Sequence, residues 1–442
     1  MHNSHKPLYS AFLLKWFPLF ALCAVIAHYF FYIHIHAANI PYADDIWDLL
    51  RFVVHAEKLD GVQEKFETAF RQYNDHRVGA TRLLVYGVYL VEGEMDFRTL
   101  IIIANLGLLL ILFLFYLIVR DEEFRWVFLL ISALLLFNLK FYTLVFMAQA
   151  AFAYYFVFIY AFACLFTLHK VTPLKFVLAA VFCSLSSFTL AAGQAAWLLG
   201  LASLIHQSLV IKQKPVLYPL LWLLVAAAML SLWRMGFESL TSNLPTSIWP
   251  ADVINPPLEE LLVRSATFFL GFLGSAFINS SVLWAGASGL VLLVALIFVT
   301  LRCYRDNDIR LVLCCWFAVA TLAAATVGRV LYVVPDTILH ARYNFFSVML
   351  VCPLTLLVLM RFAVFRTYAV YLIVVLAFMY SAIAWRNSDL SDRDLNSLYR
   401  NFNNGFYPVV FKPQANAIVI EAISLDIYNP PCRPFPRCET GE

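Results

Sequence analysis

Two adjacent carboxylates follow the first apolar segment of the chain. Residues 11–36 are predominantly apolar, and Asp44 and Asp45 come shortly after them, followed by Ile46 and Trp47. In a chain that is 62% hydrophobic, charged groups at the mouth of a membrane helix cost free energy unless they have a use. A carboxylate at this depth can act as a general base that takes a proton from an acceptor hydroxyl. Asp44 and Asp45 are therefore both candidates for catalysis.

Other polar residues are expected at the same depth, on the outer side of the membrane. Guanidinium groups there suit a lipid phosphate or pyrophosphate, because their fork of donors binds phosphate oxygens in pairs. They can also stabilise a leaving phosphate as its charge develops. An aromatic-dense stretch, 141–160, can flank a lipid tail or stack on a sugar. The candidate substrate-binding residues are Asn74, Asp75, His76, Arg77, Gln194, Arg329, Arg342 and Tyr343, with Arg82 and His340 close by in sequence.

Each candidate also has a purely structural interpretation. Asp45 can be only the cap of a following helix. His76 and Arg77 can extend into lipid headgroups or pair with Asp75. The two later arginines can be interfacial anchors, and Gln194 can be a polar residue in helix packing.

The composition indicates an all-α polytopic membrane protein. The mean hydropathy is +0.79 and only 13% of residues are charged, which excludes an ordinary soluble protein of this length. Apolar stretches of about 20 residues recur along the chain. About eleven spans are expected, within a range of about ten to thirteen: 11–34, 97–119, 124–139, 149–168, 172–190, 193–211, 215–234, 283–301, 311–328, 344–361 and 366–384.

The basic residues predict which ends of these spans face the cytoplasm. With the N-terminus inside, each short internal segment carries at least two Lys or Arg: Lys6 and Lys15, Arg120 and Arg125, Lys170 and Lys175, Lys212 and Lys214, Arg302, Arg305 and Arg310, and Arg361 and Arg366. The short external loops carry Lys140 alone. The N-terminus is expected to be an uncleaved anchor.

Three long segments then fall outside. Residues 37–96 form a first external loop in which apolar residues recur at helical spacing over 48–59, which predicts an amphipathic helix on the membrane surface. Residues 235–282 form a second loop, in which 260–280 is expected to be interfacial or re-entrant. The expected domain boundaries are a membrane domain, 1–385, and an external C-terminal tail, 386–442. In that tail, Cys432 and Cys438 are equally compatible with a disulfide or with two free thiols.

These residues resemble the polytopic bacterial glycosyltransferases of the GT-C superfamily over about residues 10–385, but not in the tail. Asp44-Asp45-x-Trp47 follows the first span, and Asn74-Asp75-His76-Arg77 precedes the second. One departure is that related chains more often carry a glutamate before His-Arg, where this chain has Asp75. Later motifs follow in matching order and sidedness: Ser186-Ser187-Phe188, Gly193-Gln194-Ala195-Ala196-Trp197, Phe269-Leu270-Gly271-Phe272-Leu273-Gly274, Gly328-Arg329 and Ala341-Arg342-Tyr343.

The resemblance implies a GT-C-like arrangement of helices and an enzyme that transfers sugar, usually with inversion, from a polyprenyl-phosphate donor. Asp44 or Asp45 would be the essential acidic residue. The acceptor would be a periplasmic glycan such as lipopolysaccharide, or a secreted protein such as a pilin. The implied location is the bacterial inner membrane, with the active site and tail in the periplasm.

Partners and cofactors follow from what the sequence contains. No basic run indicates nucleic acid, and no phosphate-binding glycine motif indicates a nucleotide cofactor. A divalent metal is compatible with the small acidic cluster but not required by it. Two other functions stay open at this point: a flippase or transporter of a lipid-linked glycan, which would need charges within spans, and an O-antigen polymerase or ligase, which would place arginines in a late external loop.

Overall fold

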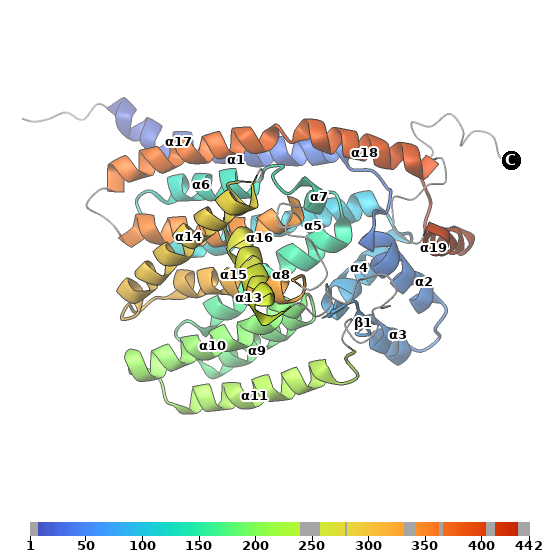
Figure 1. Cartoon of the computed structure of the whole chain (residues 1–442), viewed down its shortest axis with the longest axis horizontal. Helices are drawn as coiled ribbons and strands as arrows, with labels where there is room; N and C mark the ends of the chain where they lie inside the picture. The colour runs from blue at the N-terminus through green and yellow to red at the C-terminus, as the bar shows by residue number, and fades with distance from the viewer. Residues whose placement is uncertain are drawn as a thin grey trace, which may run out of the picture.

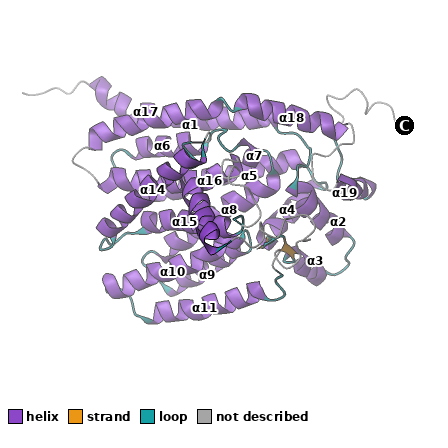
Figure 2. Cartoon of the chain, viewed as in Figure 1, coloured by secondary structure: helices purple, strands orange, loops and turns teal. Residues whose placement is uncertain are grey.

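The chain folds into a helical bundle, seen here in a computed structural model that describes residues 8–238, 257–278, 281–330, 341–361, 366–403 and 412–431. Helices form almost all of it, as Figure 2 shows. The all-α prediction is confirmed for this part of the chain. Cys432, Cys438 and His340 lie outside the described residues.

Long helices lie side by side along the long axis of the molecule (Figure 1). Seven described segments are long and apolar enough to cross a membrane, since 18 to 23 residues of helix extend about 27 to 35 Å. They belong to α1 (Leu8–His36), α5 (Phe97–Val119), α8 (Ala148–Leu168), α11 (Leu217–Arg234), α14 (Val282–Cys303), α15 (Arg310–Val327) and α16 (Ala341–Arg361).

The expected number of about eleven spans is not confirmed. Four further helices occupy expected spans: α6 (Arg125–Leu136), α9 (Pro173–Ser187), α10 (Ala195–Ile205) and α17 (Arg366–Trp385). The 12 residues of α6 extend only about 18 Å, well short of a bilayer core. At its C-terminal end α10 continues as a wider π-helical turn, η3 (His206–Val210). These elements complete the bundle, but length alone does not make α6, α9 or α10 a span.

The helix α13 (Leu258–Gly274) is not among the candidate spans, and its interfacial or re-entrant placement stays a prediction. It packs closely along α14 in a helical hairpin. A Cβ at Gly274 would lie 2.0 Å from the carbonyl oxygen of Ala285, and one at Gly289 would lie 1.9 Å from that of Leu270. Only glycine permits such close approach of the two backbones.

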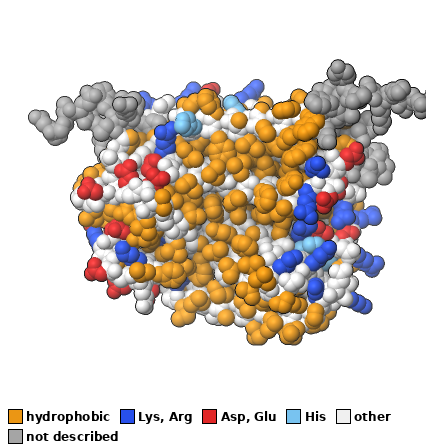
Figure 3. Space-filling model, turned by 180° about the vertical axis from the view of Figure 1, so that it is seen from behind, with side chains coloured by type: hydrophobic (Ala, Val, Ile, Leu, Met, Phe, Trp, Pro, Cys, Tyr) orange, Lys and Arg blue, Asp and Glu red, His pale blue; other side chains and the backbone are white. Residues whose placement is uncertain are grey.

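Charged residues gather at the two ends of the bundle, with a broad apolar band between them (Figure 3). This is the surface expected of a protein embedded in a membrane. The connections α10–α11 and α14–α15 lie at one end, on the left in Figure 1. The first loop lies at the opposite end, so we call that end the loop end.

The loop end is built from short elements of the first loop and from the tail. Those of the first loop are η1 (Asp45–Leu50), α2 (Arg51–Glu57), α3 (Val62–Ala69), the strands β1 (Gln72–Tyr73) and β2 (His76–Arg77), and α4 (Gly79–Glu92). Two further short elements lie in later connections: α7 (Tyr142–Val145) and η2 (Ala191–Gln194). The helix α18 (Ser388–Asn403) follows α17. The last helix is α19 (Lys412–Ser424).

The predicted amphipathic pattern over 48–59 is present, but its apolar face does not lie on the membrane surface. Leu49, Leu50, Val53 and Ala56 are completely buried within the protein, where η1 and α2 pack against α19 and η1 also packs against α8. The pattern identified the buried face correctly. It could not tell lipid from protein as the apolar partner, because both remove the same surface from water.

The tail contacts the first loop and also helices outside it. Tyr32 of α1 donates a hydrogen bond to Asp392 of α18 at 2.7 Å, and Tyr142 of α7 donates one to Asp394 at 2.7 Å. The amide of Met95 donates to the carbonyl oxygen of Ile427 at 2.7 Å. The described part of 386–442 therefore shares contacts with the membrane domain on either side of the first loop.

Candidate functional site

The two adjacent carboxylates have different surroundings. Asp44 precedes η1 and is half-buried, and its Oδ1 accepts a hydrogen bond from the hydroxyl of Tyr73 at 2.8 Å. Its charge lies within electrostatic reach of Tyr154 and Arg342, and also of His76. Asp44 is thus the member of the pair that adjoins the other candidate residues.

Asp45 is completely buried and acts as a cap. Its Oδ1 accepts the amide N–H of Gln149, in the first turn of α8, at 2.7 Å, and its Oδ2 accepts that of Tyr42 at 3.1 Å. A carboxylate at this place satisfies an amide that the helix itself leaves unpaired. The structural interpretation of Asp45 fits this geometry, although the helix it caps comes about a hundred residues later.

Burial raises the pKa of Asp45 to about 7, although the amide of Gln149 opposes the rise. Because the folded pKa lies above the unfolded value of 3.8, Asp45 contributes most stability below about pH 4 and loses that contribution as the pH rises through about 7. We expect the free energy of unfolding to fall across this window by on the order of 1 kcal/mol per pH unit. Asp45→Asn, measured by equilibrium unfolding against pH, should flatten that slope, whereas the exposed Asp121→Asn should leave it unchanged.

A third carboxylate, Asp48, forms a buried ion pair that the sequence did not single out. Its Oδ1 lies 2.7 Å from Nε and 2.6 Å from an Nη of Arg82, and its Oδ2 accepts from Gln149 at 3.2 Å. Arg82 also donates to the carbonyl oxygens of Ala69 and Arg71 at 3.1 and 2.8 Å. This pair ties η1 to α4 and to the end of α3.

The motif 74–77 forms one half of a β-hairpin. Tyr73 pairs with His76 across the two strands, and Asn74 begins the two-residue turn with φ of 49°, a conformation that asparagine tolerates better than most residues. The hairpin therefore projects Asn74, Asp75 and His76 together. Arg77 points elsewhere: it donates to the carbonyl oxygen of Phe70 at 3.0 Å and to that of Met235.

A cavity of about 330 Å³ lies beside the hairpin turn; we call it the arginine cavity. Asn74, Asp75 and His76 line it from the hairpin, and Arg329 and Tyr343 line it from the ends of α15 and α16. These five predicted residues come from three distant parts of the sequence. The remaining lining residues are Tyr154, Leu190, Ala191, Ala192, Thr321, Ala324, Ala325, Gly328 and Phe346.

Several polar atoms around the arginine cavity have no partner among the described residues. They are Nδ1 of His76, the hydroxyl of Tyr343 and Nε of Arg342, whose guanidinium lies 5.2 Å from the Tyr343 ring. The guanidinium of Arg329 makes no ion pair within the described ranges. Buried polar atoms without partners are costly, so these groups suit a polar ligand that would satisfy them.

Burial, and then the charge of Arg329, lower the pKa of His76 to about 4. His76 is therefore neutral at physiological pH and presents one N–H and one lone pair rather than a charge. The positive charge at this site comes from Arg329 and Arg342, both of which were predicted from the sequence as substrate-binding residues.

Gln194 does not line the arginine cavity, although its neighbours Ala191 and Ala192 do. The adjacent Gly193 has a packing role: a Cβ there would lie 2.0 Å from the carbonyl oxygen of Ser186. The Gly-Gln motif therefore positions η2 against the end of α9. Among the predicted substrate-binding residues, Gln194 and Arg77 are the two that the structure does not bring into the group, and Asp45 stays outside it as a cap.

The site includes two tyrosines that were not predicted from the sequence. Tyr154 lies in the aromatic stretch 141–160, and its ring stacks on that of Phe346 with 4.6 Å between the ring centroids. Nothing in the spacing of the stretch distinguishes Tyr154 from the other aromatic residues in it. Tyr73 directly precedes the 74–77 motif, so its position next to that motif was the available signal. Its pKa is raised by burial and by the Asp44 charge, so its hydroxyl stays protonated and donates.

Within the described ranges, no group of three or more His, Cys, Asp or Glu residues is arranged to hold a metal ion. The group instead combines two half-buried carboxylates, Asp44 and Asp75, with two guanidiniums, a neutral imidazole and tyrosine hydroxyls. Such a set can accept a proton from a hydroxyl and neutralise a phosphate. No family model, curated protein or solved structure matches the chain.

Proposed function

We propose that this protein is a membrane glycosyltransferase of GT-C type that moves a sugar from a polyprenyl-phosphate donor to an extracytoplasmic acceptor. The observation that carries the proposal is that Asp44 lies within electrostatic reach of His76, which lines a cavity together with Arg329 and Tyr343. A general base beside a phosphate-binding group is what transfer from a phosphate leaving group requires.

In the proposed reaction Asp44 takes the proton of an acceptor hydroxyl. The acceptor oxygen forms a bond to the anomeric carbon of the sugar while the bond from that carbon to the phosphate oxygen breaks, with inversion. The electron pair of the broken bond stays on the phosphate, whose added charge Arg329 and Arg342 stabilise. Neutral His76 and the Tyr343 hydroxyl supply hydrogen bonds that fix the phosphate.

The proposal includes a location and an orientation. The short basic connections would face the cytoplasm, and the loop end would face the periplasm across a bacterial inner membrane. All eleven expected spans would then cross or enter the bilayer, the shorter ones in a locally thinned region. The acceptor would be a surface glycan such as lipopolysaccharide, or a secreted protein such as a pilin.

A lipid flippase is a weaker candidate because of where charges are buried. Within the described ranges the buried Asp, Glu, Lys and Arg residues are Asp45, Asp48, Arg82 and Lys140. All four belong to the first loop or to the connection after α6, and none lies in a candidate span. A path for a charged headgroup through the bilayer would need polar residues along it.

The test is transfer of a labelled sugar from a polyprenyl phosphate by the purified protein. Arg329→Gln should lower the rate about ten- to a hundredfold, since it removes a charged donor to the leaving phosphate. The matched control is Arg302→Gln, at the opposite end of the bundle, which should keep the wild-type rate. Labelled lipid that crosses vesicle membranes without any loss of its sugar would refute the proposal in favour of a flippase.

A further inference from the structure

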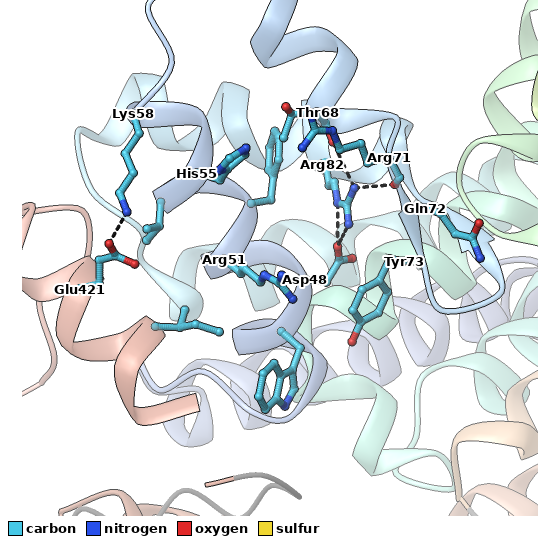
Figure 4. Close-up of a pocket in the computed structure, with 14 residues that line it drawn as sticks. Asp48, Arg51, His55, Lys58, Thr68, Arg71, Gln72, Tyr73, Arg82 and Glu421 are labelled. Atoms are coloured by element: carbon cyan, nitrogen blue, oxygen red, sulfur yellow. Dashed lines mark hydrogen bonds and ion pairs between the residues drawn. The ribbon is translucent and has the colours of Figure 1, made fainter. Parts of the chain in front are cut away.

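A second cavity, of about 350 Å³, opens at the loop end; we call it the basic cavity (Figure 4). Its walls come from η1, α2, the end of α3, β1 and the residues just before it, α4 and α19. Arg51 and His55 lie near its centre, with Lys58 and Glu421 to one side and Tyr73 to the other. It shares no lining residue with the arginine cavity.

The lining carries a surplus of positive charge. Two of its cations are neutralised within the wall: Arg82 by Asp48, and Lys58 by Glu421. The other two, Arg51 and Arg71, are exposed and form no ion pair with any described residue. The cavity therefore has two guanidiniums that are free to bind an anion, and the imidazole of His55 also lines it.

Aromatic rings accompany these charges. Trp47 and Tyr73 both line the cavity and both are half-buried. Flat apolar ring faces next to polar donors match a sugar, which has apolar C–H faces and polar hydroxyl edges. A lipid headgroup without a sugar ring would leave those faces unused.

The hairpin places the two cavities on either side of one turn. Gln72 and Tyr73 line the basic cavity, whereas Asn74 to His76 line the arginine cavity. Tyr73 also donates to Asp44, so the proposed base is in contact with a wall residue of the basic cavity. A group held there would lie on the Tyr73 side of Asp44, and a phosphate in the arginine cavity would lie beyond the hairpin turn.

We propose that the basic cavity binds an acidic sugar of the acceptor glycan, one that bears a phosphate or a carboxylate. Arg51 and Arg71 hold the anionic group, and Trp47 and Tyr73 hold the ring. The inference rests on the proposed transfer reaction for the role of acceptor, but the binding itself can be measured without a donor.

The experiment is saturation-transfer NMR on purified protein in neutral detergent, with glucose 6-phosphate, glucuronic acid and glucose as probes. Both acidic sugars should bind at least about tenfold more tightly than glucose, since a charge-assisted hydrogen bond contributes that much. Arg51→Gln with Arg71→Gln should remove the difference. The matched double control, Arg302→Gln with Arg305→Gln, should keep it, and Arg51→Lys with Arg71→Lys should restore part of it.

Three results would overturn the inference. Glucose that binds as well as its acidic relatives would show that the guanidiniums do not select an anion. Glycerol 1-phosphate that binds as well as glucose 6-phosphate would assign the cavity to lipid headgroups instead. Sugar transfer to a phosphorylated acceptor that is unaffected by the two Gln substitutions would refute the inference alone, whereas intact acidic-sugar binding without any transfer would refute the proposed function alone.

Discussion

Asp44→Asn is expected to lower the rate of sugar transfer by about 10²- to 10⁴-fold, the usual contribution of a general base. Asparagine keeps the size of the side chain and still accepts the hydrogen bond from Tyr73, so the loop should keep its shape. What the substitution removes is a group that can take a proton. The measurement is the initial rate with labelled donor at matched amounts of folded protein.

The control for Asp44→Asn must separate lost chemistry from lost charge. Asp121→Asn removes an exposed carboxylate from the opposite end of the bundle and should leave the rate unchanged. Asp44→Glu keeps the proton acceptor but displaces it by one methylene, and should retain more activity than Asp44→Asn. Wild-type transfer by Asp44→Asn would rule out Asp44 as the base.

Arg82→Gln should be the most destabilising single change in the first loop, by about 3–5 kcal/mol. The side chains of Arg82 and Asp48 are only 8% and 0% exposed. Without the guanidinium, the Asp48 carboxylate would stay buried with Gln149 as its main partner, and two backbone carbonyls would lose their donor. The free energy of unfolding is measured at equilibrium in detergent, with protease cleavage within the first loop as the signal that reports unfolding.

A double substitution tests whether the ion pair is the cause. Asp48→Asn combined with Arg82→Gln removes both charges, so it should cost less than the sum of the two single changes. The exposed Arg51→Gln, three residues after Asp48, should shift stability by less than about 0.5 kcal/mol. Additive single and double changes would show that Arg82 stabilises the loop without Asp48.

The sequence predicted the helical bundle well because its signal is local. Apolar stretches and their basic flanks were enough to locate helices. The number of spans was harder to predict. Composition does not reveal that α6 ends after 12 residues, or that α10 widens into a π-helical turn.

The site was predicted in part, and each error has a physical reason. Asn74, Asp75 and His76 were predicted together correctly because they are consecutive in sequence, and a hairpin turn places such neighbours side by side. The separate roles of Asp44 and Asp45 depend on Gln149, which only the folded chain brings near. Arg77 looked like a phosphate ligand, but neighbouring carbonyl groups satisfy it first. Residue type alone cannot show which partner a guanidinium will find.

The contact between α19 and the first loop has a consequence for biosynthesis. Lys58 and its partner Glu421 are 363 residues apart, so at about 5–20 residues per second the ribosome makes the second roughly twenty seconds to a minute after the first. During that interval α19 is not yet present to pack on η1 and α2, so part of their apolar face is accessible to chaperones and proteases. The basic cavity, walled in part by α19, takes its final form only when this late helix arrives, long after the first helix has entered the membrane.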